Sequence, residues 1–302
     1  MGICLNVDRS VMFTGETGVG KTVIARSALE SLSSKKNYIP YTVNFSAQTG
    51  AKDTQLLIES KLVKKRKTRF GAPPGSQLVF FIDDMNMPAR EVYGAQPPVE
   101  LLRQFQDFKG FYDREKLFWK EIENVTLCAA CGPPGGGRQE VTPRMIRHFT
   151  LLSVPPPSDA STKTIFSTIL QGFLADFNAD VQQLCNPLVS ASLQVYQQVA
   201  QELLPTPTKS HYTFNLRDLA KVFQGMLMIL PVNCKESETF LRLWAHESMR
   251  VFHDRLVGKD DKELFKNMLV TILNQNQPGN TSYEELFDDK CASTLPCVPT
   301  SA

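Results

Sequence analysis

The first half of the chain alternates between short apolar runs and segments with helical spacing of apolar residues. Residues 78–82 are five consecutive apolar residues, which is typical of a strand buried on both faces of a parallel sheet. Similar runs predict strands at residues 11–13, 38–45, 77–82, 125–131 and 148–154. Helices are predicted between them at residues 22–32, 54–63 and 97–108. This order predicts an α/β fold with a parallel five-stranded sheet.

Local signals refine three segments of this pattern. Asp53 is expected to cap the helix at residues 54–63, and Leu56, Leu57 and Ile58 are expected to form its apolar face. Residues 110–119 carry aromatic side chains on both sides of a charged turn, which predicts a β-hairpin. A proline at residue 143 is expected at the first position of a short helix.

Three consecutive prolines at residues 155–157 mark a boundary in the chain. Beyond them, apolar residues at three- and four-residue spacing predict only helices, at residues 162–177, 188–204, 216–230, 236–256 and 262–274. We therefore expect an α/β core at residues 1–157, an all-helical domain at residues 158–276, and a weakly specified polar tail at residues 277–302.

Residues 15–22 read GETGVGKT and match the phosphate-binding loop G-x-x-x-x-G-K-[ST] at every fixed position. The glycines let the backbone curl until several N–H groups face one point, where phosphates would lie. Lys21 is then placed to reach the β- and γ-phosphates, and the Thr22 hydroxyl to hold Mg²⁺. The alternative interpretation is a glycine-rich turn without a ligand. The predicted nucleotide-binding residues are Gly15, Glu16, Thr17, Gly18, Val19, Gly20, Lys21 and Thr22.

Two carboxylates, Asp83 and Asp84, follow the strand at residues 77–82. Ligands of doubly wound sheets bind at the carboxyl ends of the strands, so this pair is expected at the same edge as the phosphate loop. Asp83 is predicted to hold Mg²⁺, and Asp84 to orient or deprotonate the attacking water. The alternative is an acidic turn at the end of a strand.

Composition narrows the class of protein. The 302 residues carry a net charge of +2, which gives no general attraction to nucleic acid or membranes. Seven scattered cysteines fit a reducing compartment better than a disulfide framework. No apolar run reaches the roughly 18 residues of a membrane helix, and the N-terminus lacks the pattern of a signal peptide. An intracellular protein is expected.

Two short motifs are each open to two interpretations. Cys128 and Cys131 form a C-x-x-C motif, but no second cysteine pair or nearby histidine completes a metal site, so two buried strand residues are expected. The cations at residues 61–69 could contact nucleic acid. Since few aromatic residues interleave them, a solvated helix end and loop is the preferred interpretation.

Four segments resemble a dynein heavy chain, and most closely the third AAA+ module of its motor ring in the axonemal form. They are FIDDMNMP at residues 81–88, YGAQPP at 93–98, ELLR at 100–103 and GPPGGGR at 132–138. The resemblance extends over roughly residues 11–274. It implies a P-loop AAA+ core followed by a helical lid, with ATP or ADP and Mg²⁺ as cofactors.

The resemblance also implies roles for individual residues. Residues 15–22 correspond to the Walker A loop, and Asp83 to the magnesium residue of Walker B. Arg217 lies where the sensor-two arginine of the family reaches the nucleotide. Arg144 matches the arginine finger that completes the catalytic site of a neighbouring module, and Arg147 is the second choice for that role.

Three departures from the family pattern argue against fast hydrolysis. Asp84 stands where many active modules have a longer glutamate, and Gly132 stands where a sensor-one asparagine is usual. A displacement of about 1 Å or a missing polar group each commonly costs roughly 10²-fold in rate. The segment that wraps the adenine in the family is not found before Val11, which suggests either a fragment or the product of a truncated gene model.

The expected function is a regulatory ATP-binding module of a microtubule-based ciliary motor, with slow hydrolysis. The alternatives are a fully hydrolysing motor ATPase and a structural ring spacer that binds no nucleotide. Neighbouring AAA+ modules are the expected direct partners, and light and intermediate chains are expected to be contacted indirectly. Microtubule contact is also expected to be indirect, because the long heptads of a stalk are missing. The implied location is the cytoplasm and cytoskeleton, in the axoneme of a cilium or flagellum.

Overall fold

The computed structural model describes residues 1–35, 37–135, 137–234, 236–276 and 286. The chain folds as two compact units, Met1–Pro156 and Pro157–Ala302. Each unit has its own hydrophobic core, so the two are described separately. Apart from Leu286, which packs into the second core, the polar tail predicted at residues 277–302 lies outside the described residues.

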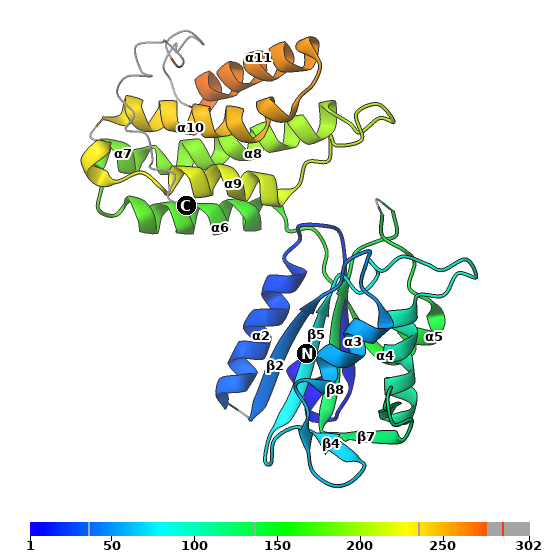
Figure 1. The fold of residues 1–302 in the computed structure, drawn as a ribbon. Coiled ribbons are helices and arrows are strands. Elements are labelled where there is room, and N and C mark those ends of the chain that lie inside the picture. Colours follow the sequence, from blue (N-terminus) through cyan, green and yellow to red (C-terminus); the bar gives the residue numbers. More distant parts are fainter. Residues whose placement is uncertain (36, 136, 235, 277–285, 287–302) are drawn as a thin grey trace. The chain divides into compact units, whose positions relative to one another are not determined.

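The first unit is built on a parallel five-stranded sheet with the strand order β2-β5-β8-β1-β9 (Figure 1). Its members are β1 (Ser10–Thr14), β2 (Tyr38–Asn44), β5 (Gln77–Asp83), β8 (Val125–Cys131) and β9 (Phe149–Ser153). The predicted parallel five-stranded sheet is confirmed. Its central strand, β8, is buried along its whole length and pairs with β5 on one side and β1 on the other.

Helices cover both faces of this sheet because its buried strands are apolar on both sides. The helices are α1 (Gly2–Asn6), α2 (Lys21–Lys35), α3 (Ala51–Glu59), α4 (Pro97–Phe108) and α5 (Pro143–Ile146). Val79 and Phe81 pack with α1 and α2 on one face, while Phe80 packs with α3, α4 and α5 on the other. Helix α1 was not predicted from the sequence, whereas α4 has the predicted bounds.

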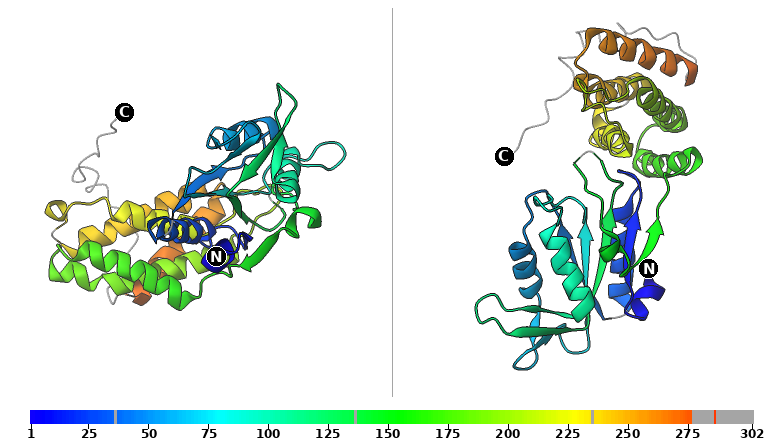
Figure 2. Two further views of the ribbon diagram at one scale, coloured as in Figure 1. Left: turned by 90° about the horizontal axis from the view of Figure 1, so that it is seen from below. Right: turned by 90° about the vertical axis from the view of Figure 1, so that its right-hand side faces the viewer.

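A second, smaller sheet lies at the end of the large sheet where β5 and β8 begin (Figures 1 and 2). Its strand order is β3-β4-β7-β6, with β3 (Val63–Lys64), β4 (Arg69–Gly71), β6 (Gly110–Tyr112) and β7 (Trp119–Glu123). Strands β6 and β7 are antiparallel, with Tyr112 opposite Trp119. The predicted hairpin is therefore confirmed.

The basic segment at residues 61–69 is largely exposed and includes a loop at residues 65–68, as predicted, but residues 63–64 form β3 and Arg69 begins β4, which was not predicted. Its cations pair with acids of the neighbouring strand β7. Arg69 Nε lies 2.9 Å from Glu121 Oε2, and Lys65 Nζ lies 3.8 Å from Glu123 Oε2. These pairs explain how a run of like charges is accommodated in a sheet.

Helix α3 also differs from its prediction. It begins at Ala51 with Gly50 as the N-cap, so Asp53 lies within the first turn, where its charge is favourable to the helix dipole. Leu56 and Leu57 are exposed by 50% and 39%, and only Ile58 of the three predicted apolar residues is buried. The helix starts three residues earlier than expected, and its buried face is formed by Thr54, Gln55 and Ile58, which leaves the two leucines toward solvent.

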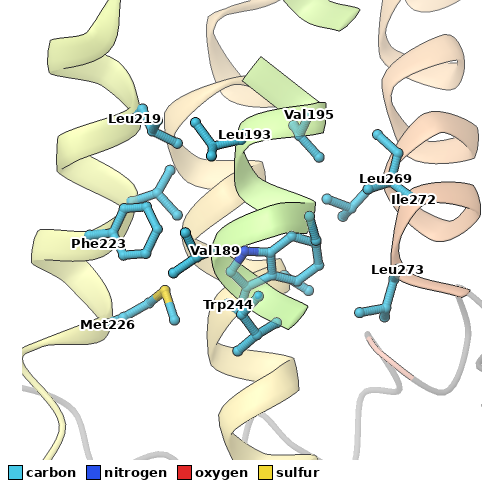
Figure 3. Packing of buried hydrophobic residues seen from close by; sticks show 14 of the residues in the cluster. Val189, Leu193, Val195, Leu219, Phe223, Met226, Trp244, Leu269, Ile272 and Leu273 are labelled. Carbon is cyan, nitrogen blue, oxygen red and sulfur yellow. The ribbon is translucent and has the colours of Figure 1, made fainter. Parts of the chain in front are cut away.

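The second unit consists of helices packed around α8. They are α6 (Asp159–Leu174), α7 (Ala179–Gln183), α8 (Cys185–Glu202), α9 (Leu216–Met226), η1 (Pro231–Asn233), α10 (Ser237–Val251), η2 (His253–Arg255) and α11 (Lys259–Asn276). Figure 3 shows apolar residues of α8, α9 and α11 around the indole of Trp244 on α10. All five predicted helices are present, and the short α7 was missed.

Candidate functional site

The phosphate loop joins the end of β1 to the start of α2, as its sequence requires. Gly15, Gly18 and Gly20 have positive φ values of 152°, 89° and 90°. A Cβ atom at Gly15 would lie 2.3 Å from the carbonyl oxygen of Val154, so only glycine fits at this position. The glycines of the motif are thus explained by local geometry.

The loop is suited to anions. In the part of the chain that the structure describes, no amide of residues 16–20 donates a hydrogen bond to another backbone group. The positive end of the α2 dipole lies at the same place. Lys21 is buried and its Nζ donates to the carbonyl oxygens of Gly15 (2.8 Å) and Glu16 (2.6 Å). Free amides, a helix N-terminus and a buried ammonium group fit the phosphates of a nucleotide.

The electrostatic surroundings of Lys21 agree with this fit. Its pKa is lowered from the ordinary lysine value by burial, and then by the positive charge of Arg138. Asp84 and Asp83 act in the opposite direction. Two cations thus share a confined space, and a bound anion would relieve their repulsion.

The predicted magnesium residues are brought together. The Thr22 hydroxyl donates to Asp83 Oδ2 at 2.7 Å, and Asp83 Oδ1 accepts a hydrogen bond from the Asp84 amide at 3.1 Å. Both carboxylate oxygens of Asp83 therefore have a fixed orientation. A hydroxyl and a carboxylate are the protein ligands that a nucleotide-bound Mg²⁺ commonly uses at such a loop.

Replacing Thr22 with valine should remove most of the Mg²⁺ dependence of nucleotide affinity, because the hydroxyl is lost at nearly constant volume. We expect an affinity loss of about tenfold or more in the presence of Mg²⁺. Calorimetric titrations with ATP in Mg²⁺ and in EDTA measure this effect. Thr22→Ser, which keeps the hydroxyl, is the control. A valine variant that gains as much affinity from Mg²⁺ as the unmodified chain would contradict the assignment.

Asp84 lies at the same edge but contacts Arg138, for which the sequence predicted no role. Its backbone has φ = 50°, and its Oδ1 lies 3.2 Å from Arg138 Nη2. Arg138 Nη1 also donates to the hydroxyl of Thr17 in the phosphate loop at 3.2 Å. Arg138 therefore bridges the phosphate loop and the second acid. The sequence signal that could have identified Arg138 is its position in the loop after β8. That strand lies between β1 and β5, which carry the phosphate loop and the acid pair.

Gly132, at the position of the expected sensor asparagine, is buried directly after β8. A Cβ atom there would lie 3.0 Å from both Cδ and Nε of Arg138. The space next to Gly132 is therefore filled by the arginine side chain. The missing asparagine is evident from the sequence, whereas the residue that lies in its place is not.

The two candidate finger arginines differ in their contacts. Arg147 Nη2 is held 2.9 Å from Asp107 Oδ1. Arg144 is exposed on α5, and within the described residues its side chain has no ion pair or hydrogen bond. Helix α5 packs beside α4, away from α2 (Figure 1). Arg144 is thus free to contact another molecule or module, and its catalytic role stays a prediction.

Arg217 belongs to the second unit, at the start of α9. Asn215 caps this helix by accepting a hydrogen bond from the Arg217 amide at 2.8 Å, and Asp218 completes a capping box. The exposed Arg217 lines a polar pocket of about 440 Å³ with Lys221, Arg250 and other residues. Its approach to the nucleotide stays a prediction.

The C-x-x-C motif is explained by packing. Cys128 and Cys131 are buried in β8, and their side chains belong to the cores on opposite faces of the sheet. Burial raises the pKa of Cys128 to about 12 and also raises that of Cys131. Two thiols on opposite faces cannot bind one metal ion, and no candidate metal cluster of His, Cys, Asp or Glu occurs among the described residues. The interpretation as buried strand residues is confirmed.

The described helices include none that is long and apolar enough to span a membrane.

Both units match families of known proteins. Residues 1–157 match the family described as "P-loop containing dynein motor region", and residues 166–262 match "Dynein heavy chain, ATPase lid domain". Dynein axonemal heavy chain 6 of Homo sapiens is 53% identical over 272 residues, covering 90% of this chain and 6% of the relative. Dynein axonemal heavy chain 1 of Homo sapiens is 46% identical over 289 residues, covering 91% and 7%. For dynein axonemal heavy chain 12 of Rattus norvegicus the values are 42%, 299 residues, 94% and 10%. The chain thus spans a tenth or less of these relatives.

Proposed function

Because this chain belongs to the dynein heavy chain family, as a P-loop motor region followed by an ATPase lid, we propose that it is a nucleotide-binding regulatory switch with slow hydrolysis. The observation that carries the proposal is a contrast between two halves of one site: the residues that would bind the nucleotide and the residues that would catalyse its hydrolysis. The binding half, with the phosphate loop and the Thr22 to Asp83 contact, is intact. The catalytic half departs from an active pattern at Asp84 and Gly132.

Slow hydrolysis follows from two features of the catalytic half. Asp84 is one methylene shorter than glutamate, so its carboxylate is poorly placed to reach the attacking water. Gly132 supplies no polar group to the terminal phosphate. Misplacement by about 1 Å or loss of one polar group commonly reduces the rate by roughly 10²-fold.

In this proposal the bound nucleotide controls the position of the lid relative to the core. ATP and ADP would be held by residues 15–22 with Mg²⁺ at Thr22 and Asp83, and Arg217 would extend from the lid to the nucleotide. A ligand shifts a conformational equilibrium only as far as it binds the two states differently. An arginine that contacts nucleotide in one lid position supplies such a difference.

The partners follow from the family. Neighbouring AAA+ modules of one heavy chain are the direct partners, and Arg144 would act as a finger in the catalytic site of one of them. We assign the chain to the third module of an axonemal motor ring. Light chains, intermediate chains and microtubules would be affected through the ring, and the location would be the axoneme of a cilium or flagellum.

Calorimetry with Mg-ADP and Mg-ATP, followed by single-turnover assays, tests the proposal on this 302-residue chain. We expect binding in the micromolar range, near −8 kcal/mol, and turnover well below the 1 to 10³ s⁻¹ that is typical of enzymes. Turnover within that range would establish a hydrolysing motor module. A folded chain that binds neither nucleotide would be a structural spacer.

A further inference from the structure

We propose that Arg138 reads the terminal phosphate of ATP in place of the missing sensor asparagine, exchanging its contact with Asp84 for the γ-phosphate. The inference rests on the proposed nucleotide binding at residues 15–22. It adds a residue that distinguishes ATP from ADP.

The strand order places Arg138 between the two halves of the site. The phosphate loop follows β1 and Asp84 follows β5, and β8 lies between these strands in the sheet. The segment that follows β8 therefore emerges between the phosphate loop and the second acid. A side chain from this segment is the one that can reach both sides.

The contacts of Arg138 use two of its three nitrogen atoms. Nη1 contacts Thr17 and Nη2 contacts Asp84, both at 3.2 Å. Nε is buried and has no hydrogen-bond partner within the described residues. A buried donor without an acceptor costs free energy, so a ligand oxygen that accepts a hydrogen bond from Nε would remove this cost and strengthen binding. A phosphate oxygen is such a group, because planar guanidinium groups bind phosphates through paired hydrogen bonds.

Asn86 holds both ends of the segment that carries Arg138. Its side-chain Nδ2 donates to the carbonyl oxygens of Gly132 (2.9 Å) and Gln139 (3.1 Å). Its backbone oxygen also accepts from the Gln139 amide at 2.9 Å. Asn86 is only 1% exposed. The backbone near Arg138 is thus anchored beside the acid pair, which suits a residue that must act at a defined position.

The charges explain why the γ-phosphate in particular should be recognised. Arg138 and Lys21 repel each other in the same space, and Asp84 compensates part of this charge. Lys21 is the residue that reaches the β- and γ-phosphates in loops of this kind. Arg138 extends toward the second acid, on the side where the chemistry at the γ-phosphate takes place. ADP lacks the group that would replace Asp84 as the partner of Arg138.

The test compares affinities of Mg-ADP and of the Mg complex of a non-hydrolysable ATP analogue by calorimetry. Arg138→Gln should weaken the analogue by about tenfold or more and change ADP by less than about twofold, because a charge-assisted contact to the γ-phosphate is lost. Arg138→Lys should lose less. Arg114→Gln, an exposed arginine in the turn before β7, is the matched control and should leave both affinities unchanged.

A second variant separates phosphate recognition from a structural role. Asp84→Asn removes the charge that competes for Arg138, so the preference for the analogue over ADP should rise. If Arg138→Gln weakens both ligands equally, Arg138 only supports the phosphate loop through Thr17, and the inference is wrong. If the unmodified chain binds neither ligand, both the proposed function and the inference fail. A third outcome would overturn the inference but leave the proposed function standing. In it, Lys21→Ala loses nucleotide binding, whereas Arg138→Gln still binds the ATP analogue more tightly than ADP by the same factor as the unmodified chain.

Discussion

Replacing Lys21 with alanine should abolish measurable binding of Mg-ATP and Mg-ADP. The buried ammonium group is aimed into the phosphate loop, where it donates to two carbonyl oxygens at 2.8 and 2.6 Å. Charge-assisted hydrogen bonds contribute about 1.5–3 kcal/mol each, so the loss of two such bonds to phosphate oxygens corresponds to a decrease of a hundredfold or more. We regard this as the largest functional effect that a single substitution in this chain would have.

Thermal unfolding with and without nucleotide measures the effect of Lys21→Ala. Ligand at 100 times its Kd stabilises the native state by about 2.7 kcal/mol, and this shift should be absent in the variant. Lys64→Ala, an exposed lysine of β3 at the other end of the unit, should keep the full shift. Because Lys21 also ties the loop carbonyls together, the melting temperature without nucleotide must be compared first. A folded variant with an undiminished shift would disprove the phosphate site.

Replacing Trp244 with alanine should destabilise the second unit by about 3–5 kcal/mol. Trp244 is completely buried among residues of α8, α9 and α11 (Figure 3). Its indole Nε1 donates to Ser192 Oγ at 2.8 Å, and that hydroxyl donates to the Leu188 carbonyl at 2.7 Å. Truncation would leave a large cavity and a buried hydroxyl without its donor.

Urea unfolding followed by far-ultraviolet circular dichroism measures this loss. The remaining tryptophan, Trp119, lies in β7 of the first unit, so its fluorescence reports on that unit separately. Trp119→Phe is the matched control and should have a much smaller effect, because this side chain is only half-buried. A Trp244→Ala variant that unfolds at the same urea concentration as the unmodified chain would show that the indole does not support the core.

The centre of the large sheet could be predicted from the sequence because β5 and β8 are long apolar runs with clear turn signals. The bounds of β8 agree to the residue, and the phosphate loop and acid pair lie at one edge, as expected. The contact between the phosphate loop and the acid pair is a consequence of the strand order. Family resemblance and the rules of parallel sheets together constrain that order. Element types were therefore predictable wherever burial on both faces imposed a strong pattern.

The misses concern features that depend on tertiary contacts. Strands β3 and β4 have exposed, cationic residues and are stabilised by acids of β7, which no local pattern reveals. Arg138 follows three glycines, and the partners of its side chain among the described residues, Thr17 and Asp84, are distant in sequence. Gly132 was correctly noted as lacking a side chain. Which side chain fills the space beside it depends on the fold of the loop after β8, which no local sequence pattern reveals.

The connection between β7 and β8 has a further consequence. Asn124, with φ = 58°, is the single residue that separates the last strand residue of the small sheet from the first residue of β8. The seven residues of β8 then extend to Gly132. At about 3.3 Å per residue this strand is roughly 23 Å long. A single buried strand thus joins the small sheet to the segment that carries Arg138, and because it pairs with β5 on one side and β1 on the other, it holds that segment in register with both the acid pair and the phosphate loop.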